Sequence, residues 1–202
     1  VPACQKIVKK AIVEKLRAAH RVRDLPERGA ACTVEVALLD NVATLTLDAT
    51  GPGLHKRGYR PLVGHAPLKE TLAAGMVLLS FWRPDRPLAD PFCGTGTIPI
   101  EAALIARNLA PGLHRRFAAE DWAGLPAAIW TDARTEARDL ARRDLDLHMS
   151  GTDIDPAALD LARANARRAG VADDIHFQQR DIAEFSTKRP YGCLICNPPY
   201  GV

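Results

Sequence analysis

Hydrophobic and polar positions follow two different patterns at the start of the chain. In residues 3–19, apolar side chains recur at helical spacing and basic side chains share another face, so we predict an amphipathic helix. Residues 32–39 and 42–48 alternate strictly instead, as half-buried strands do. Asp40 and Asn41 between them both tolerate the positive φ of a tight turn. This first block is therefore predicted to be a helix followed by a β-hairpin.

From about residue 59, helical and strand patterns alternate. The pattern predicts strands at 87–92, 148–152, 175–178 and 191–196. It predicts helices at 67–80, 98–108 and 131–147, and one from Pro156 that Gly170 ends. Strands separated by helices are typical of a parallel sheet, so we predict a doubly wound α/β fold. We see no internal repeat.

Two of these predicted helices carry specific expectations. Pro67 suits the first turn of the 67–80 helix. The apolar face of that helix is expected to be formed by Leu68, Leu72, Met76 and Leu79. Thr131 is expected to cap the 131–147 helix, and Asp155 is expected to cap the helix that begins at Pro156.

A carboxylate or amide stands at the end of each of the four predicted strands of the parallel sheet. These residues are Asp90, Asp153, Asp181 and Asn197. Ligands of open parallel sheets bind beyond the carboxyl ends of the strands, near the point where the strand order reverses. We therefore expect the four side chains to belong to one site, although each Asp taken alone could be only a cap or a turn residue.

The loop from Asp90 to Thr97 admits three nucleotide chemistries. Gly94 and Gly96 would let the backbone approach a ligand closely at the start of a helix. A dinucleotide-binding loop has a third glycine where this sequence has Pro99. It also has an acid about 20 residues further on, whereas the acid at the next strand end of this sequence is Asp153. A phosphate-binding loop requires Gly-Lys-Ser/Thr, which the sequence lacks. S-adenosylmethionine, which carries no phosphate, is the remaining interpretation.

Each strand-end acid has a suitable partner on S-adenosylmethionine. Asp90 can meet the ammonium group, Asp153 can accept from the ribose hydroxyls, and Asp181 can accept from the adenine amine. The residues expected to bind this cofactor are Asp90, Phe92, Cys93, Gly94, Thr95, Gly96, Thr97, Asp153, Ile154, Asp181 and Ile182.

The tetrapeptide Asn197-Pro198-Pro199-Tyr200 is the second chemical signal, and these four are the candidate catalytic residues. Two prolines make a rigid turn that leaves carbonyl groups exposed beside the Asn amide oxygen. Such acceptors can hold an amino group, aim its lone pair at a methyl donor and stabilise the charge that develops on nitrogen. Tyr200 offers a flat face for a flipped-out base. The alternative is an ordinary proline-rich turn.

Composition narrows the remaining possibilities. The net charge of +3 permits a nucleic-acid partner without requiring one, and no apolar run is long enough to suggest a membrane span. The odd number of cysteines, five, suits reduced thiols, so we expect a cytoplasmic protein. Cys193 and Cys196 lack a second pair, and the six histidines show no ligand spacing, so no metal is expected. Cys93 is expected to be a loop residue rather than a nucleophile.

Several segments resemble a known family. The runs that begin at Asp90, Gly151 and Asn197 resemble those of class I, Rossmann-like RNA methyltransferases. Three further segments, at 53–60, 66–74 and 110–115, resemble the THUMP-domain-containing guanine-N2 methyltransferases of bacterial 23S ribosomal RNA. The resemblance covers nearly the whole chain.

The resemblance implies a division into two regions. Residues 1–55 would be a partial THUMP-like RNA-binding region, and residues 56–202 a methyltransferase domain whose sheet continues after Asn197. It implies that Pro67 and Leu68 lie beside the amino-acid end of the cofactor. It also implies that the partner is RNA, either 23S ribosomal RNA or the pre-50S particle, and that the chain as given is truncated.

Other acceptors remain open on the sequence. The same tetrapeptide serves adenine-N6 and cytosine-N4 DNA methyltransferases and the glutamine-N5 methyltransferases of release factors, because each acceptor presents an amino group. The basic face of residues 3–19 favours RNA, and the alternative is that it is an ordinary solvated side of a helix. A non-catalytic RNA-binding protein with this fold is a further alternative, which the intact Asp90, Gly94 and Asn197 disfavour.

Overall fold

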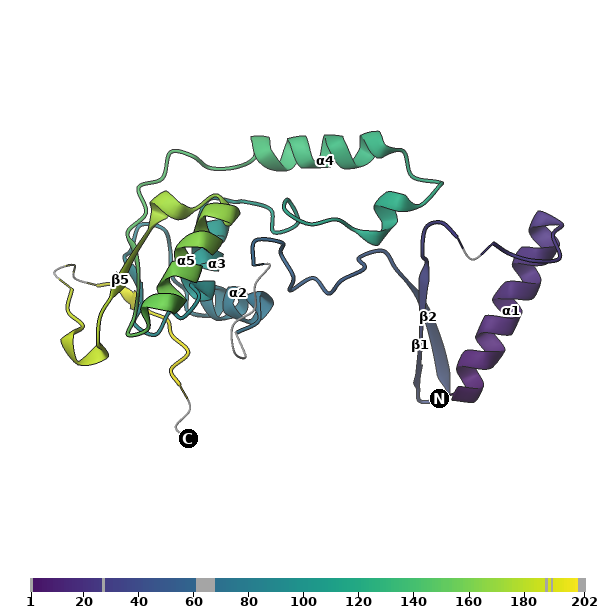
Figure 1. The fold of residues 1–202 in the computed structure, drawn as a ribbon, viewed down its shortest axis with the longest axis horizontal. Coiled ribbons are helices and arrows are strands. Elements are labelled where there is room, and N and C mark those ends of the chain that lie inside the picture. The colour runs from purple at the N-terminus through teal and green to yellow at the C-terminus, as the bar shows by residue number, and fades with distance from the viewer. Residues whose placement is uncertain (1, 27, 61–67, 188, 190, 200–202) are drawn as a thin grey trace. The chain divides into compact units, whose positions relative to one another are not determined.

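A computed structural model describes residues 2–26, 28–60, 68–187, 189 and 191–199 (Figure 1). The chain divides into two compact units. The first comprises residues 1–52 together with 117–129, and the second comprises 53–116 and 130–202. The segment 117–129 therefore belongs with the N-terminal unit, although it interrupts the second unit in sequence.

The first unit contains helix α1 (Pro2–His20) and the antiparallel hairpin of β1 (Thr33–Leu39) and β2 (Val42–Asp48). Asp40 and Asn41 have φ values of 47° and 63°. Both predicted elements and the predicted turn are confirmed, because a two-residue hairpin turn of this kind requires positive φ at both central positions.

A short 3-10 helix, η1 (Ala118–Asp121), joins this unit from far along the chain. The backbone N–H of Ala119 donates to the carbonyl of Ala49 at 3.1 Å. The indole N–H of Trp122 donates to the carbonyl of Ala31 at 3.2 Å. Two hydrogen bonds thus connect the segment after Arg116 to the chain around the hairpin.

The second unit is built on a four-stranded parallel sheet in the order β5-β4-β3-β6. Its strands are β3 (Leu88–Asp90), β4 (Met149–Asp153), β5 (Ile175–Gln179) and β6 (Cys193–Leu194). The predicted parallel α/β sheet is confirmed, although β3 and β6 are shorter than expected. From β3 the chain adds β4 and β5 on one side and then β6 on the other, so the strand order reverses between β3 and β6.

Three helices cover one face of this sheet: α2 (Glu70–Leu79), α3 (Thr97–Ala106) and α5 (Pro156–Ala169). Helices α3 and α5 contact the strands, and α2 packs on α3 (Figure 1). Helix α3 is buried along almost its whole length, which its run of small and aliphatic residues allows. The predicted ends of α5 are confirmed, because Asp155 accepts from the Ala157 N–H at 2.9 Å and Gly170 has φ 76°.

The apolar face predicted for α2 is partly wrong. Leu72 and Leu79 are exposed, Leu79 to 79%, while Ala73 and Val77 are buried instead. Small Ala73 lets α2 approach α3 closely, and this packing turns the larger leucines outward. The helix also begins at Glu70, later than predicted, and Pro67 lies outside the described residues.

The helix predicted at 131–147 is wrong at both ends. Helix α4 runs from Ala127 to Asp139, and residues 141–148 are not helical. The guanidinium of Arg107 on the C-terminal side of α3 explains the early end. It donates to the carbonyls of Arg142, Arg143 and Leu145 at 3.1–3.2 Å and pairs with Asp174. These tertiary hydrogen bonds replace the ones that a continued helix would make.

We expect Arg107→Met to lower the free energy of unfolding by about 3 kcal/mol, because it leaves the buried Asp174 unpaired and three carbonyl groups without their donor. Thermal or urea unfolding measures the loss. Arg83→Met is the matched control, since Arg83 pairs with Asp85 only at the surface, at 3.8 Å. Equal stability losses in the two variants would contradict this role for Arg107.

Candidate functional site

A cavity of about 400 Å³ lies at the carboxyl ends of β3 and β6, where the strand order reverses. Leu68, Asp90, Gly94, Thr97 and Asn197 are among the residues that line it. Two of the four predicted strand-end residues, Asp90 and Asn197, are thus brought together around one space. Its volume falls within the range of small-molecule sites.

The loop after β3 is shaped by Gly94 and Gly96. Both have positive φ, 51° and 82°, which favours glycine. A Cβ atom added at Gly94 would meet no atom within 4 Å, so the backbone there faces open space. At Gly96 it would lie 3.0 Å from the Ala162 side chain, so this glycine permits close packing on α5. The loop leads into the N-terminus of α3, whose first backbone N–H groups have no helical acceptor.

Asp90 is the most unusual charged group at the cavity, since it is only 1% exposed. The pKa of its carboxyl group is raised from 3.8 to about 7, mainly by burial. The N–H of Phe92 donates to the carboxylate at 3.1 Å and lowers this pKa. The nearby charge of Asp153 raises it. An ionised carboxylate held this way favours a cationic ligand, which would offset the cost of its burial.

Asp153 connects the loops that follow β3 and β4. One of its carboxylate oxygens accepts from the Gly94 N–H at 2.7 Å and the other from the Asp155 N–H at 3.0 Å. Each oxygen has a second lone pair that can accept from a ligand. Asp155, and not Asp153, lines the cavity itself.

Four other predicted cofactor residues lie outside the lining of this cavity, and one of them, Gly96, packs on α5 instead. Asp181 caps a short 3-10 helix, η3 (Ile182–Glu184), and accepts from the Ala183 N–H at 2.9 Å. Ile154 and Ile182 are exposed apolar side chains directly after strand-end acids. Exposed apolar groups beside carboxylates suit a planar ring with polar edges. The cofactor-binding roles predicted for these residues stay predictions.

Asn197 follows the end of β6 and is half-buried. Pro198 and Pro199 after it are exposed, and Tyr200 lies outside the described residues. Burial, and secondarily the charge of Asp90, raises the pKa of the neighbouring Cys196 thiol. The tetrapeptide therefore starts at the cavity beside the buried carboxylate.

The Cys93 thiol lines the cavity and is buried. Burial raises the pKa of the Cys93 thiol, and the charges of Asp90 and Asp153 add to this, so Cys93 is protonated and unsuited to nucleophilic attack. Among the described residues, no group of three His, Cys, Asp or Glu side chains could hold a metal ion. No helix in the same ranges is long and apolar enough to cross a membrane.

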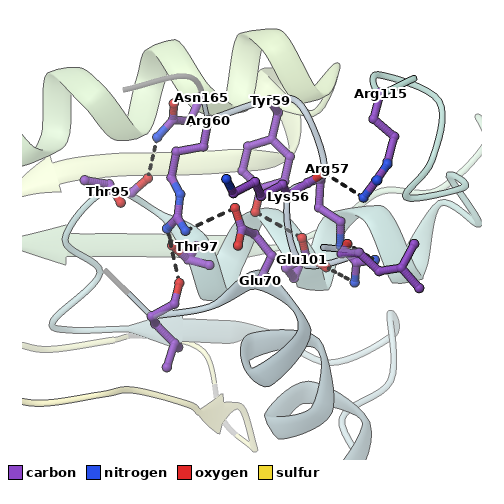
Figure 2. Close-up of polar contacts among 12 residues, drawn as sticks. Lys56, Arg57, Tyr59, Arg60, Glu70, Thr95, Thr97, Glu101, Arg115 and Asn165 are labelled. Atoms are coloured by element: carbon purple, nitrogen blue, oxygen red, sulfur yellow. Dashed lines mark hydrogen bonds and ion pairs between the residues drawn. The ribbon is translucent and has the colours of Figure 1, made fainter. Parts of the chain in front are cut away.

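Some residues that shape the loop were not singled out by the sequence. The side-chain amide of Asn165 on α5 donates to the carbonyl of Thr95 at 3.1 Å (Figure 2). Arg60 donates to the hydroxyl of Thr97 at 2.9 Å. A polar Asn on the buried face of a predicted helix was an available signal for the first contact, whereas nothing in local sequence marks the second.

A larger cavity, of about 820 Å³, lies elsewhere on the sheet. The strand register places Ser150 and His176 side by side on its wall, and Leu194 lines it too. None of the predicted site residues lines this cavity, because it lies along the strands rather than at their carboxyl ends. We therefore assign the function to the smaller cavity, where the buried carboxylate and the strand-end amide meet.

Comparison with known proteins supports this assignment. Residues 57–202 match the family described as "RMKL-like, methyltransferase domain". The chain is 50% identical to the Bacillus subtilis protein named "Putative RNA methyltransferase YpsC", over the whole of this chain and 53% of that protein.

Two solved structures match closely. One, from Listeria monocytogenes, is described as a "predicted N6-adenine-specific DNA methylase"; it has a TM-score of 0.95 and 52% identity over all of this chain and 53% of that one. The other, "SMU.472, a putative methyltransferase complexed with SAH", has a TM-score of 0.90 and 45% identity, over 99% of this chain and 53% of that one. The chain spans about half the length of these relatives.

We expect Asp90→Asn to raise the melting temperature at pH 8 by a few degrees. The folded-state pKa lies above the unfolded value, so the folded protein keeps a proton that the unfolded chain loses, and stability falls as pH rises from about 4 to about 7. The variant removes this penalty, so its gain is smaller at pH 5. The control is Asp160→Asn, an exposed carboxylate on α5. A stability gain at Asp90 that does not depend on pH would contradict this account.

Proposed function

This chain belongs to the RMKL-like methyltransferase domain family, and we propose that it carries the S-adenosylmethionine site of an enzyme that methylates the N2 amino group of a guanine in 23S ribosomal RNA. The observation that carries the proposal is the meeting of Asp90 and Asn197 at one cavity. One residue suits the cationic end of the cofactor and the other suits the amino group that receives the methyl.

The cavity fits this cofactor in two ways. Its buried carboxylate, Asp90, favours a positive group such as the ammonium of the methionine part. The open space over Gly94 allows a ligand to lie against the backbone. Asp153 and Asp181 lie outside the lining of the cavity, and we propose that they accept from the ribose hydroxyls and the adenine amine. The related structure solved with S-adenosylhomocysteine supports the same ligand.

The protein's part in the reaction is to bind and orient, while the bound cofactor supplies the electrophilic methyl group. The Asn197 amide oxygen and an exposed carbonyl of the following turn would accept hydrogen bonds from the two amino hydrogens. This holds the nitrogen lone pair in line with the methyl group. The same acceptors stabilise the positive charge that grows on nitrogen, and the proton then leaves to solvent.

Two features favour RNA as the acceptor. The exposed face of α1 carries Lys6, Lys10 and Arg17, which suit contacts to a phosphate backbone. The Bacillus subtilis relative is named as an RNA methyltransferase. The choice of guanine N2 as the acceptor rests on sequence resemblance to the guanine-N2 methyltransferases of 23S ribosomal RNA. The segments that carry this resemblance are 53–60, 66–74 and 110–115. The name of the Listeria structure makes adenine N6 the second candidate acceptor.

The test uses the full-length protein, in vitro transcribed 23S ribosomal RNA and S-adenosylmethionine with a labelled methyl group. We expect N2-methylguanosine on nucleoside mass spectrometry, and an approximately 100-fold lower rate for Asn197→Ala, because the amino group loses its main acceptor. Gln178→Ala, which removes an amide away from the cavity, should leave the rate unchanged.

Three other results would change the assignment. Label on adenine N6 would replace guanine as the acceptor. If a release factor is offered as a second substrate, label on its glutamine in place of the RNA would replace RNA as the acceptor. An undiminished rate in Asn197→Ala would contradict the role given to the strand-end amide.

A further inference from the structure

Two largely buried arginines attach the segment 53–60 to the helices of the second unit (Figure 2). Arg57 pairs with Glu101 in the middle of α3 at 3.4 Å. The hydroxyl of Tyr59 donates to the same carboxylate at 3.0 Å. Because Glu101 is buried and does not line the cofactor cavity, these contacts hold the segment to the hydrophobic core.

Arg60 makes a different set of contacts. Its side chain is only 7% exposed and pairs with Glu70, the first residue of α2, at 3.0 Å. Its guanidinium also donates to the carbonyl of Leu68 at 3.1 Å and to the hydroxyl of Thr97 at 2.9 Å. One planar group thus joins the chain before α2, the start of α2 and the first turn of α3.

Two of these partners belong to the candidate site. Leu68 and Thr97 both line the cavity of about 400 Å³, whereas Arg60 and Glu70 do not. The guanidinium therefore holds the spacing between two walls of the cavity without lining the cavity itself. A rigid fork with several donors suits this role, because it can hold a carboxylate, a carbonyl and a hydroxyl at once.

We propose that Arg60 is a positioning residue for S-adenosylmethionine, which it serves by holding Leu68 and Thr97 at the spacing that the cofactor requires. The inference rests on the proposed function. It assigns a role in cofactor binding to a residue that does not touch the ligand. Arg57 provides the comparison within the same segment, because its ion pair is also largely buried but reaches no residue of the cavity.

The experiment measures the dissociation constant of S-adenosylhomocysteine by calorimetry, together with the melting temperature, for the full-length protein. Both Arg60→Met and Arg57→Met should lower the melting temperature, because each removes the cationic partner of a buried glutamate. Only Arg60→Met should weaken binding, by about tenfold, because only it releases the two cavity walls.

A second variant keeps the proposal testable if Arg60→Met does not fold. The second carboxylate oxygen of Glu70 is buried without a hydrogen-bond partner among the described residues, so removing Arg60 alone is costly. The double variant Arg60→Met with Glu70→Met replaces the pair with apolar groups, which buried pairs often tolerate. It still lacks the bonds to Leu68 and Thr97, so we expect the same tenfold loss of affinity.

The outcomes separate the two proposals. An affinity that is unchanged in the Arg60 variants, or equally weakened in Arg57→Met, overturns the positioning role while the proposed function stands. A wild-type protein that binds no S-adenosylhomocysteine overturns the proposed function, and the positioning role falls with it. Weakened binding in the Arg60 variants alone supports both.

Discussion

The parallel pairing of β3 with β6 is the constraint on which the site depends. The register sets Leu88 beside Cys193 and Ala89 beside Leu194. It thus joins two strands that are far apart in the sequence. Because parallel strands end at the same edge of the sheet, this register carries Asp90 and Asn197 to one cavity. The strand order reverses at this pair, which leaves room beyond the strands for a ligand.

The site combines locally unfavourable features with strong support from its surroundings. A buried carboxylate with a pKa near 7 costs stability, and Gly94 and Gly96 hold positive φ values that other residues would adopt only with strain. They are held by contacts from outside the loop: Asp153 accepts from Gly94, Asn165 donates to Thr95, and α3 is buried behind them. The loop after β3 is therefore supported by contacts from β4, α5 and α3.

The sequence predicts what local chemistry determines. The hairpin turn, the cap of α5 and the parallel strands follow from φ preferences, capping and alternation, and the structure confirms these elements. Of the four polar residues predicted at strand ends, Asp90 and Asn197 line one cavity, whereas Asp153 and Asp181 lie outside its lining. The ends of α4 and the buried face of α2 depend on distant partners instead, namely the donors of Arg107 and the close packing at Ala73. No periodicity in the chain marks such contacts.

The site shows the same division. Asp90, Gly94 and Asn197 could be selected because their positions at strand ends already indicate a ligand. Arg60 could not, because its hydrogen bonds reach residues eight and 37 positions away in the chain. Its role becomes visible only when the fold brings α2 and α3 together. Motifs therefore indicate the candidate site, and long-range hydrogen bonds show which residues connect its walls.

A crystal structure of the full-length protein with S-adenosylhomocysteine tests the central claim most directly. The account predicts that the ligand lies over Gly94, with its amino group near Asp90 and its sulfur atom toward Asn197. A ligand bound in the larger cavity beside Ser150 and His176, with the space at the strand ends left empty, would contradict it.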